Sequence, residues 1–454
     1  MKDRLFQALS RSKADYTEIR FEHDDSSAIA YWGEEIENVS SHKHSGGIVR
    51  ACTKGGWGLA TFDSLDDLAH SVAEACECAA LVGREKTQLA ETPAVDEVRP
   101  ARLARDFRGV SFDEKLELVS RYNDIILHTD PAIETSHVWY ADSFRTVHFA
   151  SSRGSYFCEE RPRVVLYYVA VARDGALVQR ATDGIASAVS YDAAVGAEQL
   201  VAETARRAAA LLKAPACEGG STTVILDQEL AGVFAHEAFG HLSEADHLYE
   251  NPKMRELMHI GREMGGKQLD IIDDGSMPGM IGTQAFDDEG MPTGKTYLVK
   301  EGVLVGHLHS LETAAKMGGR PTGNARAISR AHEPIVRMTN TYIENGDLSF
   351  DELLAGVDDG IYARGSMGGE TMMEMFTFSA RYGYRIRGGK VGELVRDVVL
   401  TGNVFETLRA IDGFGNDLQI IQMPGGCGKG GQSPLPVTFG SPHLRIRDVV
   451  IGGK

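Results

Sequence analysis

The sequence predicts an α+β fold in two domains, an N-terminal domain over residues 1–217 and a C-terminal domain over residues 218–454. The chain has 454 residues, more than one ordinary hydrophobic core accommodates. Runs of alternating apolar and polar residues, typical of antiparallel strands, occur in both halves together with amphipathic helical patterns. Residues 215–220 interrupt the pattern after an alanine-rich helical run, which predicts the domain boundary there.

The first domain is predicted to begin with a short helix and a β-meander whose strands are separated by polar or glycine-containing turns. A helix then follows from about residue 63 to residue 81, with leucine, valine and alanine along one face. Residues 86–110 contain two prolines and no clear period, so we expect an extended segment. The strands of the meander are predicted at residues 16–22, 28–31, 36–40, 46–52 and 56–62.

The rest of this domain is predicted to contain a helix, two antiparallel hairpins and a second helix. Ser111 and Glu114 have the spacing of a capping box and predict a helix that ends near His128. The second helix is the alanine-rich run over residues 191–212. The four hairpin strands are predicted at residues 133–140, 146–150, 154–160 and 163–171.

The second domain is predicted to start with a buried strand over residues 222–226 and a helix that begins at Gln228, with Asp227 as its N-cap. Glycine, proline and acidic residues then predict a loop-rich region, and later alternating segments predict a mostly antiparallel sheet. The strands of this part are predicted at residues 295–299, 303–308, 337–343, 361–363, 376–387, 393–400 and 443–451.

The composition excludes several classes of function. The net charge of −18, with no basic run to compensate for it, disfavours a nucleic-acid-binding role. No apolar run is long enough to span a bilayer, and the first residues lead into an amphipathic helix, not a signal peptide. The six cysteines have no pattern of paired spacings. We therefore expect a cytoplasmic protein with reduced thiols that binds neither nucleic acid nor membrane.

Two histidines and a glutamate within six residues, His236, Glu237 and His241, predict half of a hydrolytic metal site. Residues five apart in a regular α-helix are turned about 140° away from each other, so a straight helix would not direct both histidines at one ion. We therefore predict that the helix is interrupted near Gly240. Either a turn widens into a π-bulge, or Gly240 ends the helix in the left-handed conformation.

A catalytic zinc ion usually has three protein ligands, so the two histidines leave one ligand to find. Cys427 ranks first, because a thiolate binds zinc well and the flanking glycines let the backbone approach another element. The alternative for Cys427 is a small residue tolerated in a glycine-rich turn, and a cysteine nucleophile would need a base that no nearby residue supplies. The other candidate ligands are Glu244, Asp246, His247, His332 and Glu333.

Several separated motifs resemble the TldD/PmbA family of metalloproteases, and the similarity of the N-terminal meander extends the resemblance over nearly the whole chain. TldD-type subunits of that family carry an HExxxH motif, which their PmbA or TldE-type partners lack. This chain therefore resembles the TldD type. The motifs are His236–His241, Gly368–Gly369, Val395–Asn403, Gly426–Lys429 and Gly431–Ser433.

The resemblance implies a zinc ion held by His236, His241 and Cys427, with Glu237 as the catalytic base for hydrolysis of small or unfolded peptides. Glu237 would accept a proton from the attacking water and pass it to the leaving amine. The resemblance also implies two subunits that enclose the active site, as a homodimer or as a heterodimer with a TldE/PmbA-like subunit. Two other functions stay open: a non-catalytic, peptide-binding partner subunit, and a metal hydrolase of non-peptide amides or esters.

Two features are candidates for contacting the substrate. His247 and Tyr249 are candidates for stabilising the oxyanion of the reaction. The segment Gly365–Gly369 is either a plain turn or a place where an extended peptide pairs with the backbone as an added strand.

Overall fold

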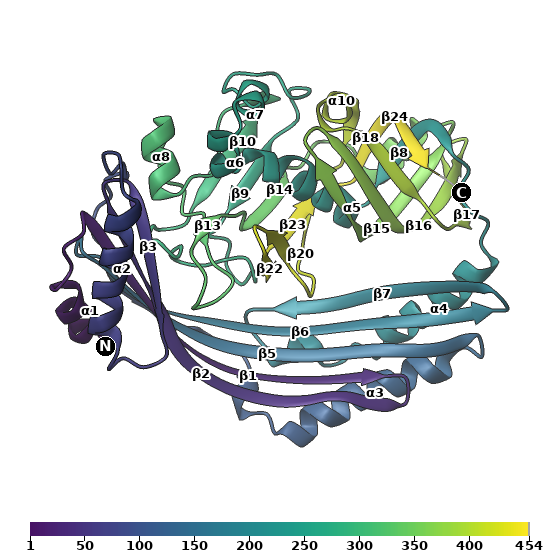
Figure 1. The fold of residues 1–454 in the computed structure, drawn as a ribbon. Coiled ribbons are helices and arrows are strands. Elements are labelled where there is room, and N and C mark those ends of the chain that lie inside the picture. The colour runs from purple at the N-terminus through teal and green to yellow at the C-terminus, as the bar shows by residue number, and fades with distance from the viewer. Residues whose placement is uncertain (453–454) are drawn as a thin grey trace.

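The computed structural model describes residues 1–452 and has an α+β fold built around two groups of sheets (Figure 1). The predicted fold class is confirmed. One sheet is formed by the chain up to residue 187, and the others follow residue 219. The division into two domains at residues 217 and 218 stays a prediction. No helix of residues 1–452 is long and apolar enough to cross a bilayer.

The first sheet has the strand order β3-β2-β1-β5-β6-β4, with β7 paired to β6. Helices α3 (Phe112–Thr129) and α4 (Glu198–Lys213) cover one face, and the C-terminal part of the chain faces the other (Figure 1). Helices α1 (Lys2–Leu9) and α2 (Leu68–Val82) lie at the end of the sheet near β3. The strands are β1 (Tyr16–Trp32), β2 (Glu35–Thr53), β3 (Gly56–Phe62), β4 (Asp96–Arg99), β5 (Ile133–Ser151), β6 (Tyr156–Asp174) and β7 (Leu177–Ser187).

These strands are longer and fewer than the sequence predicts. The polar residues from Asp24 to Ser27 indicate a turn, yet Asp24 pairs with His44 on one side and with Arg145 on the other. A strand with two neighbours has its backbone hydrogen bonds satisfied, so it continues through polar residues. The five strands predicted between residues 16 and 62 are therefore three, and the two hairpins predicted between residues 133 and 171 are one. Strand β7 was not predicted.

The helix predicted over residues 191–212 is also interrupted. A short 3₁₀ helix (Tyr191–Ala194) precedes α4, and the chain between them contains Gly196 with a positive φ of 79°. The N-cap prediction for α3 is confirmed, because the side chain of Ser111 accepts a hydrogen bond from the backbone N–H of Glu114.

The C-terminal part contains two larger sheets. One has the strand order β15-β8-β24-β18-β16-β17, with β19 also paired to β24, and the other has the order β11-β10-β9-β14-β23-β20. Most neighbours are antiparallel, but β8 runs parallel to β15 and β14 runs parallel to β23. The strands are β8 (Gly220–Leu226), β9 (Ile271–Asp274), β10 (Lys295–Lys300), β11 (Val303–Leu304), β12 (Ala325–Arg326), β13 (Ile335–Val336), β14 (Asn340–Ile343), β15 (Asp359–Met372), β16 (Met375–Arg387), β17 (Lys390–Val395), β18 (Val399–Asn403), β19 (Ile411–Phe414), β20 (Gln419–Ile421), β21 (Cys427–Lys429), β22 (Gln432–Leu435), β23 (Thr438–Ser441) and β24 (Leu444–Gly452). The helices are α5 (Gln228–Val233), α6 (Ala245–Glu250), α7 (Pro252–Leu257), α8 (Leu311–Met317), α9 (Phe350–Ala355) and α10 (Val404–Arg409).

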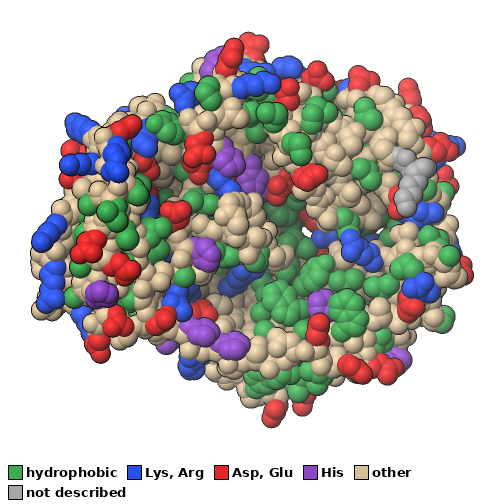
Figure 2. Space-filling model, in the orientation of Figure 1, with side chains coloured by type: hydrophobic (Ala, Val, Ile, Leu, Met, Phe, Trp, Pro, Cys, Tyr) green, Lys and Arg blue, Asp and Glu red, His purple; other side chains and the backbone are tan. Residues whose placement is uncertain are grey.

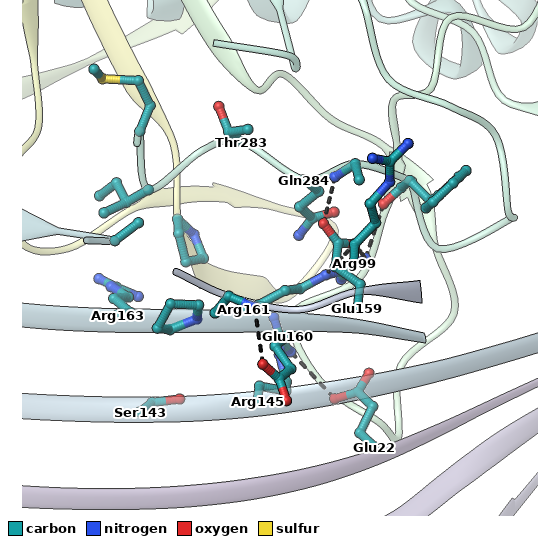
Figure 3. A pocket seen from close by; sticks show the side chains of 18 of the residues that line it. Glu22, Arg99, Ser143, Arg145, Glu159, Glu160, Arg161, Arg163, Thr283 and Gln284 are labelled. Atoms are coloured by element: carbon teal, nitrogen blue, oxygen red, sulfur yellow. Dashed lines mark hydrogen bonds and ion pairs between the residues drawn. The ribbon is translucent and has the colours of Figure 1, made fainter. Parts of the chain in front are cut away.

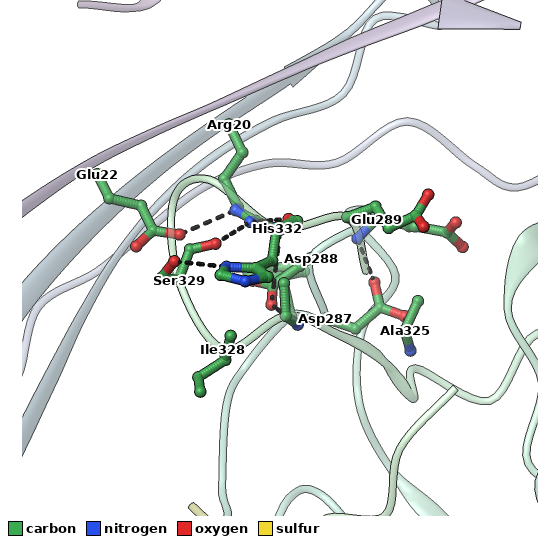
Figure 4. Close-up of polar contacts among 12 residues, drawn as sticks. Arg20, Glu22, Asp287, Asp288, Glu289, Ala325, Ile328, Ser329 and His332 are labelled. Carbon is green, nitrogen blue, oxygen red and sulfur yellow. Dashed lines mark hydrogen bonds and ion pairs between the residues drawn. The ribbon is translucent and has the colours of Figure 1, made fainter. Parts of the chain in front are cut away.

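Buried ion pairs join the first sheet to the loop at residues 287–289 (Figure 4). The Arg20 guanidinium lies 2.9 Å from the Glu22 carboxylate and 3.8 Å from that of Asp288. Arg50 reaches Glu289 at 3.2 Å. Breaking a buried pair leaves an uncompensated charge, so these contacts hold the two parts in one arrangement. Figure 2 shows that the molecule is hollowed between them, with hydrophobic and histidine side chains at the walls of the hollow.

Candidate metal centre

The helix that carries both histidines widens at the predicted place. After the N-cap Asp227, which accepts a hydrogen bond from the Leu230 N–H at 2.9 Å, α5 ends at Val233 and a π-helix runs over Phe234–Gly240. A π-helix bonds residues five apart, so it brings His236 and His241 to the same side. The predicted interruption is confirmed as a widened turn.

Gly240 is not left-handed, with φ −57° and ψ −48°, so that alternative is wrong. The reason for the glycine is steric instead. A Cβ at this position would overlap the sulfur of Met338 and lie 3.2 Å from its Cε. Met338 is fully buried, so it has little freedom to move away. The glycine therefore lets the widened turn pack closely against Met338.

The structure brings His236, His241 and Cys427 together, with one possible ligand atom from each lying within 4.8 Å of the others. The Cys427 sulfur is 3.1 Å from Nε2 of His241. His236 is 2% exposed, and neither of its ring nitrogens has a hydrogen-bond partner in the described part of the chain. Leaving a buried polar group unsatisfied costs about 1–3 kcal/mol. A metal ion bound by this imidazole would remove that cost, so the residues present fit a metal site.

The protonation state of the Cys427 sulfur also suits a metal. Burial alone would raise the pKa of the Cys427 thiol, but the neighbouring His236 and His241 lower it to about 4. Burial alone would lower the pKa of His241, but Glu244 and Cys427 raise it well above its usual value. The sulfur is therefore held as a thiolate, which is the form that binds metals. Metal binding would displace the protons of the imidazoles.

A further layer of contacts orients the three groups. Nδ1 of His241 lies 2.9 Å from the Glu244 carboxylate, which Lys429 also reaches at 3.1 Å. Burial alone would raise the pKa of Glu244, but His241 and Lys429 lower it to about 2. The buried Arg337 donates to the backbone carbonyl of Cys427 at 2.6 Å. Such partners fix the tautomer and direction of a ligating histidine, so Nε2 of His241 points at Cys427.

The other candidate ligands are not part of this cluster. Glu244 contacts Nδ1 of His241, and not the Nε2 that lies next to Cys427. Asp246 accepts a hydrogen bond from Lys429 at 2.7 Å. His332 is exposed and bonds to the Ser329 hydroxyl at 2.8 Å. The candidates His247 and Glu333 also lie outside the cluster, and neither oxyanion candidate, His247 or Tyr249, lines the pocket next to it.

Glu237 lies beside the cluster, with its carboxylate oxygens 4.0 Å from Nε2 of His236 and 3.6 Å from Nε2 of His241. Its side chain is 29% exposed, so it reaches the pocket. The pocket has a volume of about 300 Å³ and is bounded by His236 and Cys427 of the metal cluster, by β15 and β16, and by Tyr167, Arg180 and Thr182 of the first sheet. Sequence reasoning missed these three residues, and no local signal marks them.

The glycine-rich segment at residues 365–369 also borders this pocket, and it is not a plain turn. It belongs to β15 and contains a register shift where it pairs with β16. The backbone N–H of Gly365 donates to Asp227, and that of Ser366 donates to Glu229. These two donors are therefore already used, and pairing with a peptide stays a prediction for the rest of the segment.

A larger cavity of about 1100 Å³ lies between the first sheet and the loops above it (Figure 3). Its wall is rich in arginine, including Arg145, Arg161 and Arg163, but it contains none of the three clustered groups. Its connection to the metal cluster is indirect, because Arg163 donates to the backbone carbonyl of Gly425 at 2.8 Å, two residues before Cys427.

Comparison with known proteins identifies the family. Models of the PmbA/TldA metallopeptidase match along the chain, with domain 1 at residues 17–80, the central domain at residues 105–214 and the C-terminal domain at residues 219–453. A metalloprotease of Synechocystis is 43% identical over 98% of this chain and 96% of its own length. A zinc metalloprotease TldD homolog of Saccharolobus solfataricus is 27% identical over 97% of both chains.

The crystal structure of TldE from Thermococcus kodakarensis has the same fold, with a TM-score of 0.80, 18% sequence identity and 100% coverage of both chains. The resemblance to the TldD/PmbA family is thus confirmed. The chain belongs to the PmbA/TldA metallopeptidase family.

Proposed function

We propose that this chain is the TldD-type, zinc-dependent subunit of a peptidase that hydrolyses small or unfolded peptides. The observation that carries the proposal is the convergence of His236, His241 and Cys427 beside Glu237. Within residues 1–452, neither ring nitrogen of the buried His236 has a hydrogen-bond partner. The name of the Saccharolobus relative, a zinc metalloprotease, agrees with this choice of metal.

The donor set favours zinc among the common metals. Two imidazoles and one thiolate would suit zinc, and three protein ligands are the usual number in catalytic zinc sites. When bound, zinc supplies a Lewis acid that lowers the pKa of water and polarises a carbonyl group. None of the six cysteines, all of which lie within residues 1–452, forms a disulfide, which agrees with the proposed cytoplasmic location.

Glu237 is proposed as the general base. Its carboxylate lies next to the candidate ligands and is partly exposed to the pocket, so it can accept a proton from an attacking water and deliver it to the leaving amine. Glu244 and Lys429 would keep His241 directed at the site throughout. A non-catalytic subunit does not need a general base, so the presence of Glu237 argues against a non-catalytic function.

The proposal includes a second subunit, either a TldE/PmbA-like partner or another copy of this chain. Support comes from family membership and from the shared fold of the TldE protein. Size-exclusion chromatography with light scattering, on the chain alone and after mixing with a TldE-like protein, distinguishes the two assemblies.

Cleavage of an unstructured peptide by the zinc-loaded assembly tests the function. We expect Glu237→Gln to lower kcat by about 10²–10⁴-fold, the usual contribution of general base catalysis. Glu250→Gln, an exposed glutamate on α6, is the matched control and should cleave normally. Normal cleavage by Glu237→Gln would refute the assignment of the base. An ester and a non-peptide amide, assayed in parallel, identify a non-peptide hydrolase if they alone are hydrolysed.

A further inference from the structure

The face of β7 that lies against the C-terminal part supplies an arginine to the metal-site pocket. Arg180 and Thr182 are two residues apart on this strand, so both point to the same face, and both line the pocket with His236 and Cys427. Gly184 continues the same face. Arg180 is thus presented by a strand that is hydrogen-bonded along its length to β6, not by a free loop.

Close packing keeps this strand in place beneath the loop that carries Cys427. A Cβ at Gly184 would lie 2.6 Å from the ring of Pro424, which shows how near the strand and the loop are. The Thr182 hydroxyl lies 3.9 Å from the sulfur of Met367 on β15. These contacts hold the strand that carries Arg180 against the loop of Cys427 on one side and against β15 on the other.

The charges around the pocket leave Arg180 without a counter-ion. The second arginine of the pocket, Arg381, pairs with Glu229 at 2.8 Å and with Asp183 at 3.7 Å. Arg180 is exposed and forms no ion pair with any residue in the described part of the chain. The pocket also contains the carboxylates of Glu229 and Glu237, but neither forms an ion pair with Arg180 in the described part of the chain. An arginine fork at a pocket that is not paired with a protein carboxylate is suited to a carboxylate on a ligand.

We propose that Arg180 binds the carboxy-terminal carboxylate of a short peptide, so that the substrates of this site are peptides with a free C-terminus close to the scissile bond. This inference rests on the proposed peptidase function and specifies its substrate. The volume of the pocket, about 300 Å³, is at the lower end of ligand sites, roughly 300–1,000 Å³, so only a short segment of a peptide would occupy it. A charge-assisted, bidentate contact fixes the C-terminus in one register.

Binding to the zinc-loaded Glu237→Gln protein tests the inference without turnover. Two unstructured peptides of the same sequence, one with a C-terminal acid and one with a C-terminal amide, are compared by fluorescence anisotropy. We expect the acid to bind about tenfold or more tightly, the effect of a hydrogen bond to a charged group. Adding Arg180→Gln should remove this preference. Arg173→Gln, an exposed arginine of the same sheet that pairs with Glu134, should keep it.

Equal binding of acid and amide, or a preference that survives Arg180→Gln, would overturn the inference. An amidated peptide with an internal glutamate that binds as well as the acid would also overturn it, and would assign Arg180 to acidic side chains. Cleavage by wild type is measured separately. If wild type cleaves neither peptide while the binding preference depends on Arg180, the peptidase function fails and the carboxylate site stands.

Discussion

The packing of Gly240 against Met338 predicts a strong energetic coupling between these two positions. The backbone at Gly240 is ordinary helical backbone, so alanine is allowed there and would favour the helix by about 0.5–1 kcal/mol. Its methyl group, however, would overlap the fully buried Met338 sulfur. Overpacking of this kind costs about 1–3 kcal/mol. Because the helical gain offsets part of this cost, we expect Gly240→Ala to destabilise the protein by the difference, up to about 2 kcal/mol.

A double-mutant cycle isolates the steric cause. Met338→Ala alone should cost about 2–5 kcal/mol, because it leaves a cavity. In that background the obstructing atoms are gone, so Gly240→Ala should be neutral or slightly stabilising, which gives a coupling of about 1–3 kcal/mol. Urea unfolding of the metal-free proteins, followed by circular dichroism, measures the four free energies of unfolding. Gly266→Ala is the control, since a Cβ there meets nothing within 4 Å. Equal destabilisation by Gly240→Ala in both backgrounds would refute the steric explanation.

Three further predictions concern the surroundings of the site. Glu244→Gln keeps the shape but not the charge of the partner of His241, so zinc affinity, measured by competition with a chromophoric chelator, should fall about 10–100-fold. Burial raises the pKa of Glu229 from 4.5 to about 7, so between these pH values the folded protein holds a proton that the unfolded chain releases. The free energy of unfolding should therefore fall between pH 4.5 and 7, by up to roughly 3 kcal/mol. Urea unfolding at a series of pH values should show this decline in wild type and a flatter profile in Glu229→Gln, whereas an unchanged profile would contradict it. Chelation of the metal should abolish cleavage but leave the far-ultraviolet circular dichroism intact, because the helix with both histidines is embedded in a large apolar core.

Local signals in the sequence were sufficient for the elements around the site. The strand over residues 222–226, the cap at Asp227 and the helix start at Gln228 depend on neighbouring residues, and all three are observed. The need for an interrupted helix followed from the spacing of the histidines alone. The role of Gly240 did not, because its packing partner, Met338, is distant in sequence and no local rule points to it.

Long-range pairing accounts for what the sequence did not reveal. Asp24 lies inside a strand because it has neighbours on both sides, and local polarity indicates the opposite. Cys427 could be ranked as a ligand by its chemistry, but its contact with His241 spans 186 residues. Arg180 was missed because β7 itself was not predicted, and a residue cannot be assigned to a pocket before its strand is known.

The zinc content of the purified protein tests the central claim most directly. Cys217 is the matched control for Cys427, since both are buried cysteines of the C-terminal core but Cys217 lies outside the metal cluster. We expect stoichiometric zinc, by atomic absorption after dialysis, in wild type and in Cys217→Ala, and its loss in Cys427→Ala. Full zinc retention by Cys427→Ala would contradict the proposed ligand set.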